Sequence, residues 1–326
     1  MLSKKQVLIV FLSLFVYYWI KYVKQGPVYI SDKRLDGKTV LITGGNVGIG
    51  KAAAIEFAKL GAKVVIASRN KTKSLKAAKE IADASENRNV FSMQLDLEKF
   101  DSIKSFAEEF HKKEENLHYL INNAGVLGIN GITDYGFHRV FAINHFGPFL
   151  LTNLLMKKMK ETSKKSPVRI INVSSGAYRF GPLDFDLLHN EADGLVSGYV
   201  MYGQSKLANI YFTSELNNRL IELDITTYSL HPGVIQSELG TDVMFSSPPM
   251  SIIRQVANYL VLKDAYYGAQ TTMYCSLDDN IIQLSGQYFH NCKHEELREL
   301  AKDQETSRKL WKLSEKVTQK YLTDNW

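Results

Sequence analysis

A glycine-rich turn between an apolar run and a helix-forming run constrains the fold of this chain more than any other feature. The turn is TGGNVGIG at residues 43–50, with KTVLIT before it at 38–43 and KAAAIEFA after it at 51–58. A strand, a glycine turn and a helix start make up the first half of a βαβ unit, and a second apolar run at 63–68 supplies its second strand. The segment therefore predicts a dinucleotide-binding unit.

The glycines have separate physical roles in such a unit. Gly44 permits the tight turn, Gly48 lets backbone N–H groups approach a pyrophosphate at the positive end of the helix, and Gly50 allows the helix to pack closely on the strand. An ordinary tight turn is the alternative, which the flanking strands and helix disfavour. The residues predicted to bind the nucleotide here are Gly44, Asn46, Val47, Gly48, Ile49 and Gly50.

Strand-like and helix-like segments alternate through the 326 residues, which favours a single α/β domain built on a doubly wound parallel sheet, the Rossmann fold. We expect this domain at 37–326, after an anchor and linker at 1–36. The net charge is +6, and +4 of it lies within the first 37 residues. The remainder is too close to neutral for a nucleic-acid surface, so no nucleic-acid partner is expected.

Other motifs follow the turn in a fixed order, and their sum resembles the short-chain dehydrogenase/reductase family. They are LDL at 95–97, NNAG at 122–125, Asn144, SS at 174–175, YGQSK at 202–206 and PG at 232–233, after glycines spaced G-x-x-x-G-x-G. Within the family the chain is most similar to the microsomal retinol dehydrogenases, through AINH at 142–145, SKLAN at 205–209, HPG at 231–233, YGAQT at 267–271 and ETSRKLW at 305–311.

Tyr202 and Lys206 are four residues apart, so on a helix they share one face. An ammonium group there is expected to lower the phenol pKa from about 10 and make Tyr202 a proton donor to a carbonyl, or an acceptor in the reverse reaction. The same spacing recurs at 17/21, 29/33 and 259/263. Only Tyr202 follows both the nucleotide unit and the strand at 168–173 that ends in paired serines.

A carbonyl oxygen that gains negative charge needs a second donor, and either Ser174 or Ser175 qualifies physically at the end of a central strand. The family resemblance selects Ser175, and it implies that Asn144 holds a water joining Lys206 to solvent. The predicted catalytic set is therefore Asn144, Ser175, Tyr202 and Lys206. A non-catalytic nucleotide-binding scaffold or redox sensor is the rival hypothesis, and it would need none of these four.

The second strand ends in Ser68, Arg69 and Asn70, where a carboxylate would otherwise bind the adenosine ribose. Arg69 can pair with a 2′-phosphate, so NADP(H) is the expected cofactor, although a solvated arginine is the alternative. The resemblance implies further cofactor contacts by Asp96, Leu97, Asn123, Ala124, Gly125, Tyr202, Lys206, Pro232, Gly233, Ile235 and Ser237.

His290, Cys292 and His294 alternate, which on one strand would place them on one face as metal ligands. No fourth ligand stands nearby, so no metal site is predicted.

Residues 7–20 are apolar or aromatic apart from Ser13, with lysines on both sides. No small-residue cleavage site follows, so a retained anchor is favoured over a signal peptide or a buried helix. Extended to Val23, the helix would be roughly 26 Å long at about 1.5 Å per residue, against a hydrocarbon core of about 30 Å, so it either spans with local thinning or lies in the interface. The flanking charges and the Asn70 acceptor triplet favour a cytosolic domain, with the endoplasmic reticulum implied by the resemblance.

Residues 243–253 are apolar and contain two prolines, which indicates a lid over the substrate and a second membrane contact, or else core packing. A lid and an anchor suit a lipophilic alcohol or aldehyde as substrate and membrane lipid as a partner, and the resemblance makes retinal the candidate. The sequence leaves the direction of the reaction and the oligomeric state open.

Overall fold

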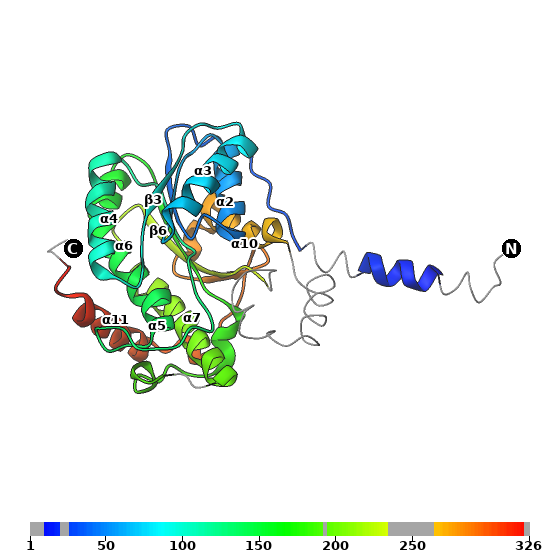
Figure 1. Cartoon of the computed structure of the whole chain (residues 1–326). Coiled ribbons are helices and arrows are strands. Elements are labelled where there is room, and N and C mark those ends of the chain that lie inside the picture. Colours follow the sequence, from blue (N-terminus) through cyan, green and yellow to red (C-terminus); the bar gives the residue numbers. More distant parts are fainter. Residues whose placement is uncertain (1–9, 20–25, 192–193, 234–263, 323–326) are drawn as a thin grey trace.

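The computed structural model describes residues 10–19, 26–191, 194–233 and 264–322. Within them one eight-stranded sheet forms the centre of the molecule, in the order β3-β2-β1-β4-β5-β6-β7-β8 (Figure 1). All neighbouring strands are parallel except β7 and β8, which are antiparallel. The strands are β1 Thr39–Thr43, β2 Lys63–Ser68, β3 Val90–Gln94, β4 Tyr119–Asn122, β5 Val168–Val173, β6 Ile225–His231, β7 Tyr288–His290 and β8 Lys293–His294.

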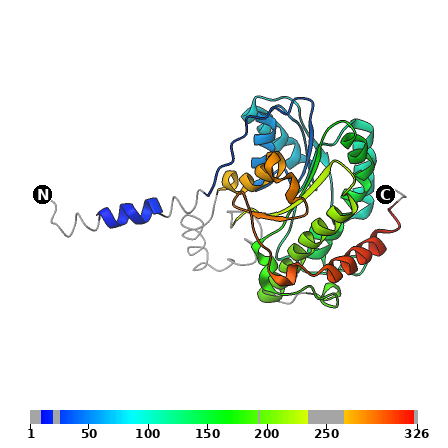
Figure 2. The same cartoon turned by 180° about the vertical axis from the view of Figure 1, so that it is seen from behind.

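Helices cover both faces of this sheet, as Figures 1 and 2 show from opposite sides. One face carries α2 Gly48–Lys59, α3 Lys71–Ser85 and α10 Ala265–Leu277, and the other carries α4 Phe100–Lys113, α6 Gly147–Ser163, α7 Gly194–Arg219 and α11 Gln304–Thr318. Short helical turns connect them: α5 Arg139–Phe141, η1 Ala142–Phe146, η2 Gly176–Phe180, η3 Leu187–His189, η4 Asp279–Leu284 and η5 Glu299–Ala301.

Successive side chains along a strand point to opposite faces of the sheet, so the apolar core has one part on each face. In β1, Leu41 packs into the cluster beneath α4, α6 and α7, whereas Val40 and Ile42 pack beneath α2 and α10. All three side chains are fully buried, as expected for a parallel strand covered by helices on both sides. The parallel pairing of the strands therefore places their carboxyl ends at one edge of the sheet, and the candidate site is built on those ends.

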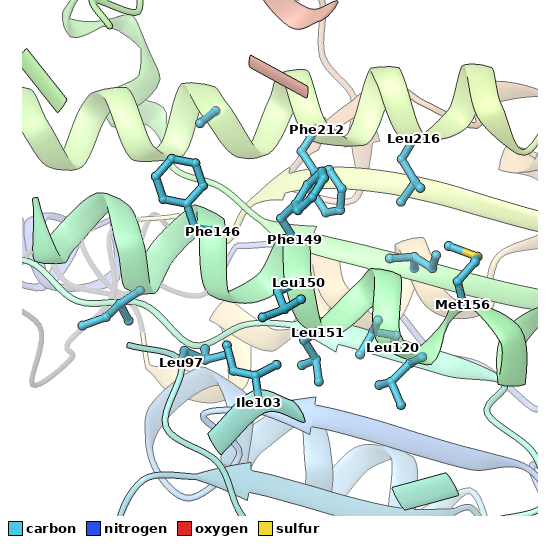
Figure 3. Packing of buried hydrophobic residues seen from close by; sticks show 14 of the residues in the cluster. Leu97, Ile103, Leu120, Phe146, Phe149, Leu150, Leu151, Met156, Phe212 and Leu216 are labelled. Carbon is cyan, nitrogen blue, oxygen red and sulfur yellow. The ribbon is translucent and has the colours of Figure 1, made fainter. Parts of the chain in front are cut away.

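Aromatic contacts hold the helices of the α6 face together. Phe149 of α6 packs against Phe212 of α7 at 5.4 Å between ring centroids and against Trp311 of α11 at 5.0 Å. Figure 3 shows Phe149 and Phe212 close together, with Leu150 and Leu151 nearer the sheet. This packing fixes α7, which carries Tyr202 and Lys206, relative to the strands.

The expected α/β fold with a mostly parallel central sheet is confirmed. His290, Cys292 and His294 do not share one strand, because β7 ends at His290 and the chain turns there. Asn291 and Cys292 have left-handed backbones, with φ of 50° and 55°, before β8 begins at Lys293. In the described part of the chain, no group of three or more His, Cys, Asp or Glu side chains is arranged so that it could hold a metal ion.

Residues 10–19 form a helix whose large apolar side chains are all exposed, by 47% to 68%. Over the described ranges, no helix combines the length and the apolar character that a membrane crossing requires. The linker that leads to β1 lies against α10: the Tyr29 N–H donates to Gln270 Oε1 at 2.9 Å, and Lys33 pairs with Asp279 at 2.6 Å. The linker is therefore attached to the domain before β1 begins.

Candidate active site

The glycine turn after β1 leaves room for a ligand at the start of α2. Gly44 has φ of +67°, a conformation that favours glycine, and the position of a Cβ on Gly48 faces open space. A Cβ on Gly50 would lie 2.5 Å from both the Gly44 carbonyl oxygen and Asn123 Nδ2, so α2 packs on the turn itself and on the end of β4. The backbone N–H groups at the start of α2 are thus available to an anion.

Hydrogen bonds between Thr43, the last residue of β1, and the residues that follow β4 brace this turn. Thr43 Oγ1 accepts the N–H groups of Asn123 and Ala124, each at 3.0 Å, and Asn123 Nδ2 donates to the Thr43 carbonyl at 2.9 Å. The Asn123 side chain therefore fixes the loop backbone, which is a different task from the ribose contact that the resemblance implies for this segment.

A cavity of about 310 Å³ extends from the glycine turn to the end of β2. Its lining includes most of the residues predicted for the adenosine side, together with one cation that the sequence interpretation missed, Lys73 in the first turn of α3. Asn70 caps that helix by accepting the Lys73 N–H at 2.9 Å. The predicted residues in this lining are Gly44, Asn46, Arg69, Asp96, Leu97, Ala124 and Gly125.

The helix that carries Tyr202 approaches the serine turn very closely. A Cβ on Gly203 would lie 2.7 Å from the Ala177 carbonyl oxygen in η2, so only glycine permits this approach. Ser175 is the N-cap of η2, and its Oγ accepts the Ala177 N–H at 3.2 Å. The hydroxyl groups of Ser175 and Tyr202 are hydrogen-bonded to each other. The sequence analysis gave no role to Gly203, although a glycine beside the tyrosine was visible in the motif.

Lys206 is buried, and its ammonium group donates to the Val173 carbonyl at the end of β5, at 3.0 Å. Ser174 Oγ donates to the Lys206 carbonyl at 2.7 Å, so Ser174 ties α7 to β5 while Ser175 faces Tyr202. A Cβ on Gly125 would lie 3.2 Å from Lys206 Nζ and 3.4 Å from Asn144 Oδ1. Gly125 thus leaves the space in which these two polar groups come together.

Asn144 lies in η1, a π-helical turn between α5 and α6. Its amide makes two hydrogen bonds to the backbone of Val126, at 2.8 and 2.9 Å, and a third to Ser205 Oγ at 2.9 Å. Ser205 is next to Lys206, so Asn144 connects the loop after β4 to the helix of the Tyr–Lys pair. A π-turn is common at functional sites because it re-aims side chains.

The expected effect of Lys206 on Tyr202 is wrong in this structure. Burial raises the pKa of the Tyr202 phenol from 10.0 to about 12, and the hydrogen bond with Ser175 only partly opposes the rise. Burial also lowers the pKa of the Lys206 ammonium from 10.5 to about 8. The ammonium points to the Val173 carbonyl and lies 5.5 Å from the tyrosine ring centroid, so the loss of hydration outweighs its attraction for a tyrosinate.

Pro232 and Gly233 follow β6 directly, at the same edge of the sheet as the glycine turn and Ser175. Ile235, Ser237 and the predicted lid at 243–253 lie outside the described residues. Among the remaining loop residues, Val47 is the N-cap of α2 and Ile49 lies in its first turn.

The site joins an open glycine position at the start of α2 to a Ser–Tyr–Lys group formed by the end of β5 and by α7. The open Gly48 position and the cavity fit a dinucleotide, and the two hydroxyl groups fit a carbonyl oxygen. This arrangement defines a dinucleotide-dependent oxidoreductase of the alcohol/carbonyl type.

Comparison with known proteins agrees with this class. The family model for short chain dehydrogenases matches residues 38–185. The chain is 41% identical to retinol dehydrogenase 12 of Bos taurus over 89% of both chains, and 40% identical to retinol dehydrogenase 11 of Homo sapiens over 90% of both. The chain therefore belongs to the short-chain dehydrogenase/reductase family.

Solved structures share the fold. An uncharacterized protein from Mycobacterium paratuberculosis superposes with a TM-score of 0.70 at 29% identity, over 90% of this chain and 98% of that one. A short chain dehydrogenase from Shigella flexneri superposes with a TM-score of 0.61 at 20% identity, over 81% of this chain and 94% of that one.

We predict that Gly125→Ala lowers kcat for carbonyl reduction by about 10-fold, because displacement of a catalytic group by about 1 Å can cost about 100-fold. The matched control is Gly198→Ala, since Gly198 lies in α7 and a Cβ there meets nothing within 4 Å. The control should keep its activity and gain about 0.5–1 kcal/mol of stability from the helical alanine. Steady-state kinetics and thermal unfolding measure both effects. Equal activity of the two variants would refute the prediction that a side chain at Gly125 displaces Lys206 or Asn144.

Proposed function

We propose that this protein is a membrane-anchored, NADP(H)-dependent oxidoreductase that interconverts a lipophilic alcohol and its aldehyde or ketone. The observation that carries the proposal is the hydrogen-bonded Ser175–Tyr202 pair beside buried Lys206, at the sheet edge that also holds the glycine turn. A binding-only scaffold would have no need for two hydroxyl donors converging on one point.

The bound nicotinamide would supply the hydride that reaches the carbonyl carbon. Tyr202 then donates its phenolic proton to the carbonyl oxygen, and Ser175 donates a hydrogen bond to the same oxygen as it becomes negative. Lys206 keeps a positive charge near the phenol, and Asn144 holds the Val126 backbone and the Ser205 hydroxyl beside it. In the reverse direction the alcohol proton passes to a Tyr202 phenolate.

Burial raises the pKa of the Tyr202 phenol to about 12. A phenol with this pKa is fully protonated at neutral pH, so it is ready to donate. Oxidation requires the phenolate, whose population rises only as the pH approaches the phenol pKa.

The preference for NADP(H) is supported by two cations at the adenosine end of the cavity, Arg69 and Lys73. A 2′-phosphate placed there would meet the Arg69 guanidinium and the Lys73 ammonium at the start of α3, where the helix dipole also favours an anion. Lys51, in the first turn of α2, is paired with Glu80 instead.

The substrate class is supported by the similarity to relatives named retinol dehydrogenases and by the apolar segment at 243–253. A retinoid aldehyde is the candidate. The membrane anchor is supported by the exposed apolar surface of residues 10–19, which has no polar stripe through which it could face water. A substrate dissolved in the bilayer and an anchored enzyme would meet at the same membrane. The catalytic domain would face the cytosol at the endoplasmic reticulum.

Tyr202→Phe is expected to lower turnover about 100-fold or more while NADPH binding stays intact, because it removes the proton and keeps the ring. NADPH oxidation with a panel of retinoid, steroid and fatty aldehydes measures turnover, and NADPH fluorescence measures binding. Tyr266→Phe, at the start of α10 where the tyrosine is exposed, is the matched control and should retain activity. Wild-type protein that reduces none of these aldehydes, or a Tyr202→Phe variant within a few-fold of wild type, would refute the proposed chemistry.

Arg69→Asp should weaken NADPH binding by about 10- to 100-fold and leave NADH nearly unchanged, since a hydrogen bond to a charged group contributes about 1.5–3 kcal/mol. Lys73→Met should have a smaller effect of the same sign. Lys51→Met is the control and should leave the ratio of the two cofactors unchanged. Titration of each cofactor against each variant tests this, and an unaltered NADPH/NADH ratio in Arg69→Asp would show that the phosphate is bound elsewhere.

Deletion of residues 1–25 is expected to release the protein from membranes with its NADPH site intact. The cut stops before Tyr29 and Lys33, whose contacts with Gln270 and Asp279 attach the linker to the domain. Deletion of residues 1–36 is the control and should lower the Tm, because it removes these contacts and buried Leu35. Carbonate extraction, flotation and NADPH binding are measured on all forms. A soluble full-length protein, or an unfolded first truncation, would contradict the anchor.

A further inference from the structure

The hairpin formed by β7 and β8 brings one carboxylate between two elements that border the candidate active site. Glu295, which follows β8, forms an ion pair with Arg179 through Oε1. Its other oxygen, Oε2, lies 2.9 Å from His290 Nδ1. A single side chain therefore connects η2 to β7.

The Arg179 end of this connection reaches the turn of the catalytic serine. Arg179 lies in η2, whose N-cap is Ser175. A Cβ on Gly176, the residue after Ser175, would lie 3.1 Å from an Arg179 guanidinium nitrogen and 3.3 Å from His231 Nε2. The backbone that directs the Ser175 hydroxyl is thus enclosed between these two side chains.

The His290 end reaches the last residue of β6. The ring centroids of His290 and His231 are 4.7 Å apart with the rings tilted by 31°, and the two residues are paired across the parallel strands β6 and β7. His231 Nδ1 accepts the Gly233 N–H at 3.4 Å, so its ring also contacts the Pro232–Gly233 segment. The contacts form a closed ring that runs from Gly176 through Arg179, Glu295, His290 and His231 back to Gly176.

Two buried tyrosines lie beneath this ring of contacts. Tyr178 and Tyr288 are fully buried and meet edge-to-face at 5.4 Å, and the Arg179 guanidinium lies 4.9 Å from the centroid of the Tyr178 ring. The Glu295 side chain is 29% exposed and that of Arg179 31% exposed. An ion pair so close to solvent adds little to global stability, so its main effect is on geometry.

We propose that Glu295 is a positioning residue that holds the Ser175 turn and the Pro232–Gly233 segment in register with each other. The inference rests on the proposed function of Ser175 as a hydrogen-bond donor to the carbonyl. Both segments follow neighbouring strand ends, and the contacts of Glu295 with Arg179 and His290 add a side-chain link between them beside the backbone hydrogen bond from Ser174 to Leu230. Hydride and proton transfer need both segments in place at once.

The test compares Glu295→Gln with Glu296→Gln in the full-length protein. Glu296 is the next residue along the chain and pairs with exposed Lys302, away from η2. We expect Glu295→Gln to lower kcat by about 10-fold and to change the NADPH dissociation constant less than about 3-fold. The reason is that the substitution misplaces the Ser175 turn relative to the Pro232–Gly233 segment but removes no cofactor contact. Hydrogen exchange should become faster in residues 175–180 and 231–233 of Glu295→Gln alone.

The two readouts separate failure of the inference from failure of the proposed function. Wild-type protein without turnover refutes the proposed function, while the exchange rates still decide whether Glu295 holds the two segments. Unchanged exchange, or a kcat equal to that of Glu296→Gln, refutes the inference. A loss of kcat matched by an equal loss of Tm and of NADPH binding also refutes it, since that would be general destabilisation.

A double-variant cycle with Arg179→Met guards against a Glu295→Gln protein that folds poorly. If Arg179 and Glu295 act as one unit, the double variant should lose no more kcat than the worse single variant. Arg179→Lys, which keeps the charge, should recover part of the activity that Arg179→Met loses. Strictly multiplicative losses in the cycle, or no recovery with lysine, would refute the coupling.

Discussion

The buried ammonium group of Lys206 is the group around which the candidate active site is organised. A charge removed from water is costly unless it is well hydrogen-bonded, and the Val173 carbonyl at the end of β5 supplies one partner at 3.0 Å. Ser174, at the same strand end, donates a hydrogen bond to the backbone carbonyl of Lys206. The loop after β4 leaves space for the ammonium because Gly125 has no side chain. Two strand ends, those of β4 and β5, and one helix are therefore fixed relative to a single charge.

Close backbone approaches complete this arrangement and explain why the reacting groups converge. Gly50 brings α2 onto the turn after β1, and Gly203 brings α7 onto the turn that carries Ser175. Each contact would be blocked by one methyl group, so each sets a distance between elements that side-chain packing alone would leave wider. The aromatic cluster around Phe149 then keeps α7 in this position.

Much of the fold could be predicted from the sequence because its signals are local. The apolar runs, the glycine turn and the order of the motifs indicate an alternating α/β chain, and the structure confirms the mostly parallel sheet. The Tyr202–Lys206 spacing likewise needs only the geometry of one helix. The hairpin after His290 could not be predicted in the same way, because the alternation of His290, Cys292 and His294 suits a strand equally well until the left-handed turn is known.

The sequence by itself determined the class of fold and predicted the nucleotide loop and the Tyr202–Lys206 pair, since each depends on residue type and short spacing, whereas the choice of Ser175 over Ser174 came from the family resemblance. Only the tertiary structure decided the electrostatics of that pair. Spacing along a helix predicts that Lys206 lowers the pKa of Tyr202, yet packing directs the ammonium to Val173 and burial raises the phenol pKa to about 12. The positions of Lys73, Gly203 and Glu295 beside the candidate site were also decided in three dimensions, because the segments around them come from distant parts of the chain.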